Sequence, residues 1–312
     1  MRKFLFFALI GIITLSCERE IIDSGKTGMQ CNLTWTVTRD GVLTISGSGE
    51  MIDYNNSSGD VPWESHQQFI RTVVVEDGIT RIGNLSFFGK PNLTTVIIGN
   101  DVTHIGSAAF GGSSALTSVI IGNSVEVIED NAFERAKSLT SITIPNSVIF
   151  IDWWAFIDNI NLTSVTIPDN VRWIGRGAFR NCHNLTSVTI GNSVEWIGSR
   201  VFENNHNLTS VIIPNNVEEI WDYAFANSGL TSVTIGSGIT RIWQGVFAGC
   251  SDLTSITCYA QTPPPIDEWN DFTGVFEGVN KETATLYVPA ESIELYRQAQ
   301  GWKDFQTIVV IE

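Results

Sequence analysis

The sequence has 312 residues, a formal net charge of −15 and a hydrophobic fraction of 43%. An acidic chain repels phosphate groups, so nucleic acid and a directly bound anionic lipid surface are excluded as partners. The five cysteines and four histidines show neither a C-x-x-C pair nor a Cys/His spacing typical of a metal site. We therefore expect no metal and no cofactor.

The first sixteen residues have the composition of a secretory signal peptide. Arg2 and Lys3 precede an apolar run from Phe4 to Ile13, and small or polar residues then lead to Cys17. The apolar run is too short to cross a bilayer as a helix. We therefore expect residues 1–16 to be removed during export.

Cys17 resembles the lipobox cysteine of bacterial lipoproteins, which is lipidated and becomes the mature N-terminus. That motif prefers leucine three residues before the cysteine, where Thr14 stands here, so ordinary signal cleavage with a free cysteine is the alternative. A multiply acylated Cys17 would anchor the protein through buried methylene groups. We expect residues 17–30 to form a polar tether and the exported protein to be lipid-anchored to the outer membrane, facing the cell surface.

Residues 31–69 carry no clear repeat and predict an N-terminal cap. Apolar and polar residues alternate from Leu33 to Val37, and a second apolar stretch begins at Val42 after a turn at residues 39–41. This pattern is typical of a β-hairpin. A hairpin here would cover the first coil of the following repeats, whose strand edge and apolar end need protection.

Residues 70–262 repeat a unit of about 23 residues. In a clear copy, residues 178–197, Ala-Phe and a few polar residues precede L-T-S-V-T-I, then glycine, N-S-V and a final isoleucine. The phenylalanine recurs at Phe87, Phe110, Phe133, Phe156, Phe179, Phe202, Phe225 and Phe247. A fixed period of this length is the signature of a solenoid, in which no coil can bury its apolar side alone.

Each copy predicts a strand with one buried face. Apolar residues alternate with Ser187 and Thr189 in the run from Leu185 to Ile190, which is the period of two expected of a strand. Stacked in register, the copies turn each position into a column along the solenoid. The leucine, valine, isoleucine and phenylalanine columns form the predicted core, and three cysteines (Cys182, Cys250, Cys258) are expected to be buried in it.

Residues 263–312 depart from the period and predict a degenerate last coil with a C-terminal cap. Prolines at 263–265 exclude helix and central strand there, and Phe276 comes 29 residues after Phe247. The run from Thr285 to Val288 predicts a closing strand.

One column gives the candidate binding surface. The residues directly before the core isoleucine are Arg81, His104, Val127, Phe150, Trp173, Trp196, Glu219 and Arg241. Because charged residues are accepted there, the column must be accessible to solvent, and its three aromatic residues are expected to stack in an exposed row.

Further tryptophans extend this row. The predicted ligand-binding residues are Phe150, Trp153, Trp173, Trp196, Trp221 and Trp243. Aromatic side chains supply large contact areas and mark recognition surfaces. The alternative is a ladder whose cross-strand contacts only stabilise the sheet.

The motif A-F-x-x-C-x-x-L-T-S-V-T-I with N-S-V-x-x-I at residues 178–197 resembles the BspA-like leucine-rich repeat family of Bacteroidetes surface lipoproteins. The hairpin segment and the end, L-Y-V-P-A at 286–290 with G-W-K-D-F at 301–305, resemble that family's caps. The resemblance implies a mainly β, right-handed leucine-rich-repeat solenoid of about 23-residue coils with parallel strands, an N-terminal β-hairpin cap and a C-terminal cap. It also implies adhesion or binding without a conserved active site.

No spaced pair of carboxylates, Ser/His/Asp set or phosphate loop indicates an enzyme, so no catalytic residues are expected. We expect a monomeric cell-surface binding or adhesion module for a host extracellular protein, a glycan or other bacterial cells, with a lipid anchor as its sole membrane contact. The alternative is a structural or assembly component of the cell envelope without a soluble ligand.

Overall fold

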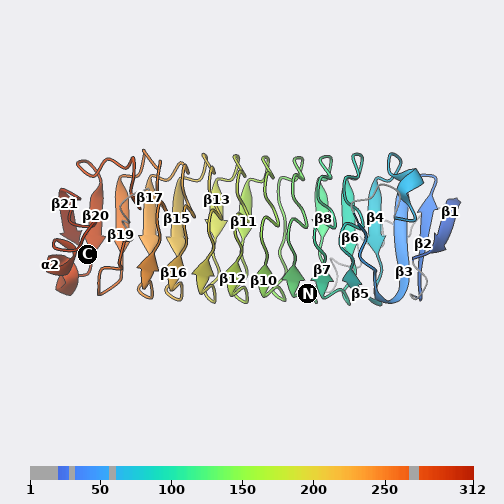
Figure 1. Ribbon diagram of the computed structural model, residues 1–312, viewed down its shortest axis with the longest axis horizontal. Coiled ribbons are helices and arrows are strands. Elements are labelled where there is room, and N and C mark those ends of the chain that lie inside the picture. The colour runs from blue at the N-terminus through green and yellow to red at the C-terminus, as the bar shows by residue number, and fades with distance from the viewer. Residues whose placement is uncertain (1–19, 28–31, 56–60, 267–273) are drawn as a thin grey trace.

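Two rows of short strands run along a rod-shaped solenoid (Figure 1). The computed structural model describes residues 20–27, 32–55, 61–266 and 274–312. The predicted signal peptide, residues 1–16, and the predicted lipidation site, Cys17, lie outside the described residues.

The first row contains strands from the predicted alternating runs of the repeat, together with β20 and β21 of the C-terminal part. Its members are β4 (Thr72–Val75), β6 (Thr95–Ile98), β8 (Ser118–Ile120), β11 (Ser164–Thr166), β13 (Ser187–Thr189), β15 (Ser210–Ile213), β17 (Ser232–Ile235), β19 (Ser255–Cys258), β20 (Thr285–Val288) and β21 (Thr307–Val310). The row is divided into three runs of paired strands, β4 to β8, β11 with β13, and β15 to β21. Within each run the strands pair in parallel, as in Val165 with Val188 and Val211 with Val233.

The second row contains the core isoleucine of each coil and the residue before it. Its members are β5 (Ile79–Ile82), β7 (His104–Ile105), β9 (Val127–Ile128), β10 (Phe150–Ile151), β12 (Trp173–Ile174), β14 (Trp196–Ile197), β16 (Glu219–Ile220) and β18 (Arg241–Ile242). These strands also pair in parallel, and the register sets Phe150 beside Trp173 and Trp173 beside Trp196.

The core lies between the two rows and consists of columns of equivalent apolar residues from successive coils. Phe87 to Phe276 form one continuous ladder of buried rings, whose neighbouring centroids lie 5.1 to 5.8 Å apart. Trp63 stacks on the first ring at 5.3 Å, and Trp302 meets the last ring edge-on at 5.4 Å. The phenylalanine column of the sequence is therefore the axis of the hydrophobic core, closed at each end by a tryptophan.

The N-terminal cap contains the predicted hairpin, formed by the antiparallel strands β2 (Asn32–Thr38) and β3 (Val42–Glu50). The first part of β3 pairs with β4 and its end pairs with β5. A single long strand thus starts both rows and covers the first coil. A 3-10 turn, η1 (Glu64–His66), follows.

The tether predicted for residues 17–30 is wrong for part of its length. Ile21–Lys26 form strand β1, which pairs antiparallel with β2. The side chains of β1 are mostly exposed, including Ile21 at 57%. The strand is held by its backbone pairing with the edge of β2. Because it has no buried face, its sequence lacks the alternation of apolar and polar residues that would predict a strand.

The C-terminal cap follows the degenerate last coil. Phe276 continues the ladder, and β20 and β21 extend the first row in parallel. A short 3-10 turn, η2 (Ala290–Ser292), leads into α2 (Ile293–Tyr296). The buried Trp302 donates its indole N–H to the carbonyl of Pro264 at 2.9 Å, which fixes this end of the core.

Candidate ligand-binding surface

The second row carries the predicted aromatic residues on consecutive strands. Phe150 is 39% exposed, whereas Trp173 and Trp196 are half-buried. No ring-to-ring contact joins these three within the described ranges, so the predicted stacking is wrong although the register is as expected. The repeat places these three residues at the same position of successive strands. The orientation of each ring depends on the side chains around it.

Two more of the predicted residues follow β16 and β18. The rings of Trp221 and Trp243 lie 6.4 Å apart, and Trp221 is 42% exposed. Trp243 donates its indole N–H to Glu219 at 2.8 Å, and the guanidinium of Arg241 covers its ring at 4.0 Å. Trp243 is therefore held by two charged neighbours, while Trp221 presents its ring to solvent.

Trp153 lies in the turn after β10. It is 45% exposed and its backbone N–H donates to the carboxylate of Asp130 at 2.9 Å. The ring of Trp154 lies 6.0 Å from it, edge-on. We call Phe150, Trp153, Trp173, Trp196, Trp221 and Trp243 the aromatic band.

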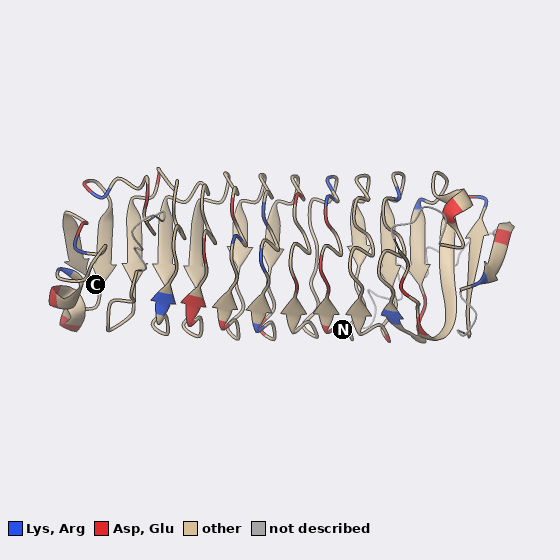
Figure 2. Cartoon of the chain, in the orientation of Figure 1, with Lys and Arg blue, Asp and Glu red and all other residues tan. Residues whose placement is uncertain are grey.

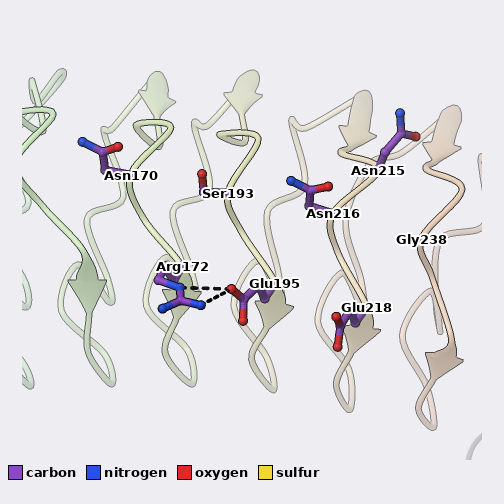
Figure 3. A pocket seen from close by; sticks show the side chains of 8 residues that line it. All are labelled: Asn170, Arg172, Ser193, Glu195, Asn215, Asn216, Glu218 and Gly238. Carbon is purple, nitrogen blue, oxygen red and sulfur yellow. Dashed lines mark hydrogen bonds and ion pairs between the residues drawn. The ribbon is translucent and has the colours of Figure 1, made fainter.

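A polar groove of about 630 Å³ is built from four consecutive coils. It is lined by Asn170, Arg172, Ser193, Glu195, Asn215, Asn216, Glu218 and Gly238 (Figure 3). Arg172 and Glu195 directly precede Trp173 and Trp196 in the chain, but no residue of the aromatic band is part of the groove lining. We call this set the polar groove.

The polar groove was not predicted from the sequence. Arg172 donates to one oxygen of Glu195 from Nε at 3.0 Å and from Nη2 at 2.5 Å. The column two places before the core isoleucine contains Arg172, Glu195 and Glu218 in succession. This run of charged residues was the sequence feature that could have indicated the polar groove. The pattern alone does not show that a groove forms beside the column.

An acidic cluster flanks the aromatic band near Trp153. Burial raises the pKa of Asp152 to about 6, and the nearby carboxylates of Asp130 and Glu129 add to the effect. The ordinary value is 3.8, so the folded protein binds this proton more tightly than the unfolded chain does. Ionisation of Asp152 therefore opposes folding, and stability falls as the pH rises from about 4 through 6.

Asp152→Asn is expected to remove this penalty. The variant should melt at a higher temperature than the parent protein near pH 7.5 and at about the same temperature near pH 4, as measured by thermal denaturation across that range. Asp252→Asn, at an exposed position, serves as the control. A lower melting temperature of Asp152→Asn at neutral pH would contradict the assignment.

Other candidate groups have structural surroundings. His183 and His206 stack with centroids 5.3 Å apart, but among the described residues no group of three or more histidine, cysteine, aspartate or glutamate side chains could hold a metal ion. Cys182, Cys250 and Cys258 are buried thiols, as predicted. No helix in the described parts of the chain has the length and apolar character needed to span a membrane.

The two rows of parallel strands, the 23-residue register and the buried phenylalanine ladder define a leucine-rich-repeat solenoid. The family model "BspA type Leucine rich repeat region (6 copies)" matches residues 65–186 and 174–262, and the chain belongs to this family. Among curated proteins, none matches this sequence.

Two solved structures with TM-scores above 0.5 share the fold. A leucine-rich repeat protein from Eubacterium ventriosum is 21% identical, with a TM-score of 0.53 over 93% of this chain and 85% of its own. One from Bacteroides ovatus is 21% identical, with a TM-score of 0.53 over 91% of this chain and 76% of its own. The T. pallidum leucine-rich repeat protein is 25% identical, with a TM-score of 0.49 over 73% and 91%.

Proposed function

We propose that this protein is a cell-surface binding or adhesion module that recognises a host extracellular protein, a glycan or other bacterial cells through the aromatic band. The observation that carries the proposal is the set of accessible rings along the second row, with Phe150, Trp153 and Trp221 each at least 39% exposed. Exposed aromatic rings grouped on one surface are typical of recognition sites. A catalytic role has no comparable support.

The surrounding charges favour a selective surface over simple aggregation. Acidic and basic residues are interspersed along the rod (Figure 2). The net charge of −15 keeps copies of the molecule apart, so the rings remain available to a ligand. Monomers displayed from a lipidated Cys17, on the outer face of the outer membrane, are the arrangement we propose.

Replacing Trp173 and Trp196 together with alanine tests the aromatic band. We expect binding on an array of glycans and matrix proteins to weaken at least tenfold, because the two rings supply contact area at the centre of the band. Tyr259→Ala, 43% exposed and outside the band, should bind as the parent protein does.

Thermal melting of the same variants separates recognition from a stabilising ladder. If the rings only support the sheet, the double variant should lose several degrees of melting temperature while its array profile stays unchanged. Protease treatment of intact cells tests the location. A protein that survives untouched faces the periplasm, and the envelope-component alternative would then replace adhesion.

A further inference from the structure

The polar groove contains side-chain hydrogen-bond acceptors. Asn170 donates its side-chain N–H to the carbonyl of Asn146 at 2.6 Å, and Asn216 does the same to Asn192 at 2.6 Å. These bonds hold the two amides in one orientation. Among the described residues, no donor is found for the Oδ1 atom of either amide. The groove is therefore preorganised to receive hydrogen bonds from a ligand.

The charges of the polar groove disfavour an anionic ligand. Arg172 is neutralised by the two hydrogen bonds that it gives to Glu195. Glu218 is exposed, and no partner of its carboxylate is found within the described ranges. A sulfated or carboxylated ligand would meet this unpaired negative charge, whereas hydroxyl groups can donate to it in charge-assisted hydrogen bonds.

The dimensions and direction of the polar groove suit a short oligomeric ligand. Successive coils lie about 4.8 Å apart, and the lining comes from four of them, from Asn170 to Gly238. Its volume of about 630 Å³ lies within the range of small-molecule sites, roughly 300–1,000 Å³. Repeated acceptors at the coil spacing can each meet one unit of a repeating ligand.

We propose that the polar groove binds a neutral oligosaccharide that runs along the solenoid axis, with Glu218 accepting hydrogen bonds from its hydroxyl groups. This inference rests on the proposed function and names the ligand class. Sugar rings combine hydroxyl edges with apolar C–H faces. The hydroxyl edges match Glu218, Asn170 and Asn216 of the lining. Trp173 and Trp196 follow two lining residues in the chain and are the rings nearest in sequence for the C–H faces.

Glu218→Ala tests this inference. Hexasaccharides of glucose, xylose, mannose and N-acetylglucosamine form the neutral set, and a heparin hexasaccharide and an oligogalacturonate form the acidic set, each titrated by calorimetry. We expect at least one neutral oligosaccharide to bind, with affinity reduced at least tenfold by Glu218→Ala. Glu126→Ala is the matched control, because Glu126 occupies the same repeat column, is also exposed and lies outside the polar groove.

Three results would overturn the inference. Stronger binding of the acidic set contradicts the charge argument, and equal affinity of Glu218→Ala and the parent protein places the sugar elsewhere. No binding of any neutral oligosaccharide at millimolar concentration removes the ligand class. If a matrix protein binds instead and the Trp173/Trp196 double variant loses it, the inference fails while the proposed function stands. If no array ligand depends on those tryptophans, the proposed function fails.

Discussion

Replacing Phe179 with alanine is expected to lower the free energy of unfolding by about 3–5 kcal/mol. Phe179 is fully buried, and its ring stacks between Phe156 at 5.2 Å and Phe202 at 5.7 Å. Alanine would leave a cavity at the axis of the core, and the strands on both sides are too strongly constrained by their register to close it. Urea denaturation measures the loss.

The effect should also be local, since each coil contacts mainly its neighbours. Hydrogen exchange is expected to show lost protection in the coils that contain Phe156 and Phe202 before distant coils respond. Phe88→Ala is the control, because Phe88 follows a ladder residue directly but is 38% exposed. Equal losses for Phe179→Ala and Phe88→Ala would contradict the central role of the ladder.

Replacing Glu64 with alanine is expected to cost about 3 kcal/mol. The Lys90 side chain is only 3% exposed, and its ammonium pairs with the Glu64 carboxylate at 2.9 Å. This pair joins η1 of the N-terminal cap to the first coils. Without Glu64 the buried charge would have no carboxylate partner. The chemical denaturation midpoint should therefore fall, with earlier opening of the cap.

A second change distinguishes an unpaired charge from a general loss of packing. Lys90→Met in the Glu64→Ala background should recover much of the lost stability, because methionine fills the site without a charge. Glu20→Ala removes the exposed partner of Arg39 and should leave the denaturation midpoint unchanged. A double variant less stable than Glu64→Ala alone would contradict the explanation.

The repeats were predictable because a period of 23 residues forces every equivalent residue into one column. Once Phe179 and Phe202 share a column, a parallel stack places both in the core. The hairpin was predictable for a similar reason, since alternation from Leu33 to Val37 requires one buried face. Strand β1 was not predictable, because its backbone pairing with β2 demands no buried side chains.

Some features of the candidate site were likewise predictable from the repeat, and others were not. Sequence comparison between coils places Trp173 and Trp196 in one accessible column, but ring orientation follows from side-chain rotamers and local contacts. The indole N–H of Trp243 is hydrogen-bonded to Glu219. This contact joins two coils, so it cannot be predicted from one copy of the repeat. The amides of Asn170 and Asn216 likewise take their direction from carbonyls one coil away.

The sequence by itself determined the solenoid, its register, its apolar core and the row of aromatic residues, because these depend on periodicity alone. The tertiary structure decided which rings face solvent, how β1 closes the N-terminal edge and where the turns leave the polar groove. Those features depend on contacts between side chains and backbone groups of different coils, and such contacts exist only after the coils have stacked.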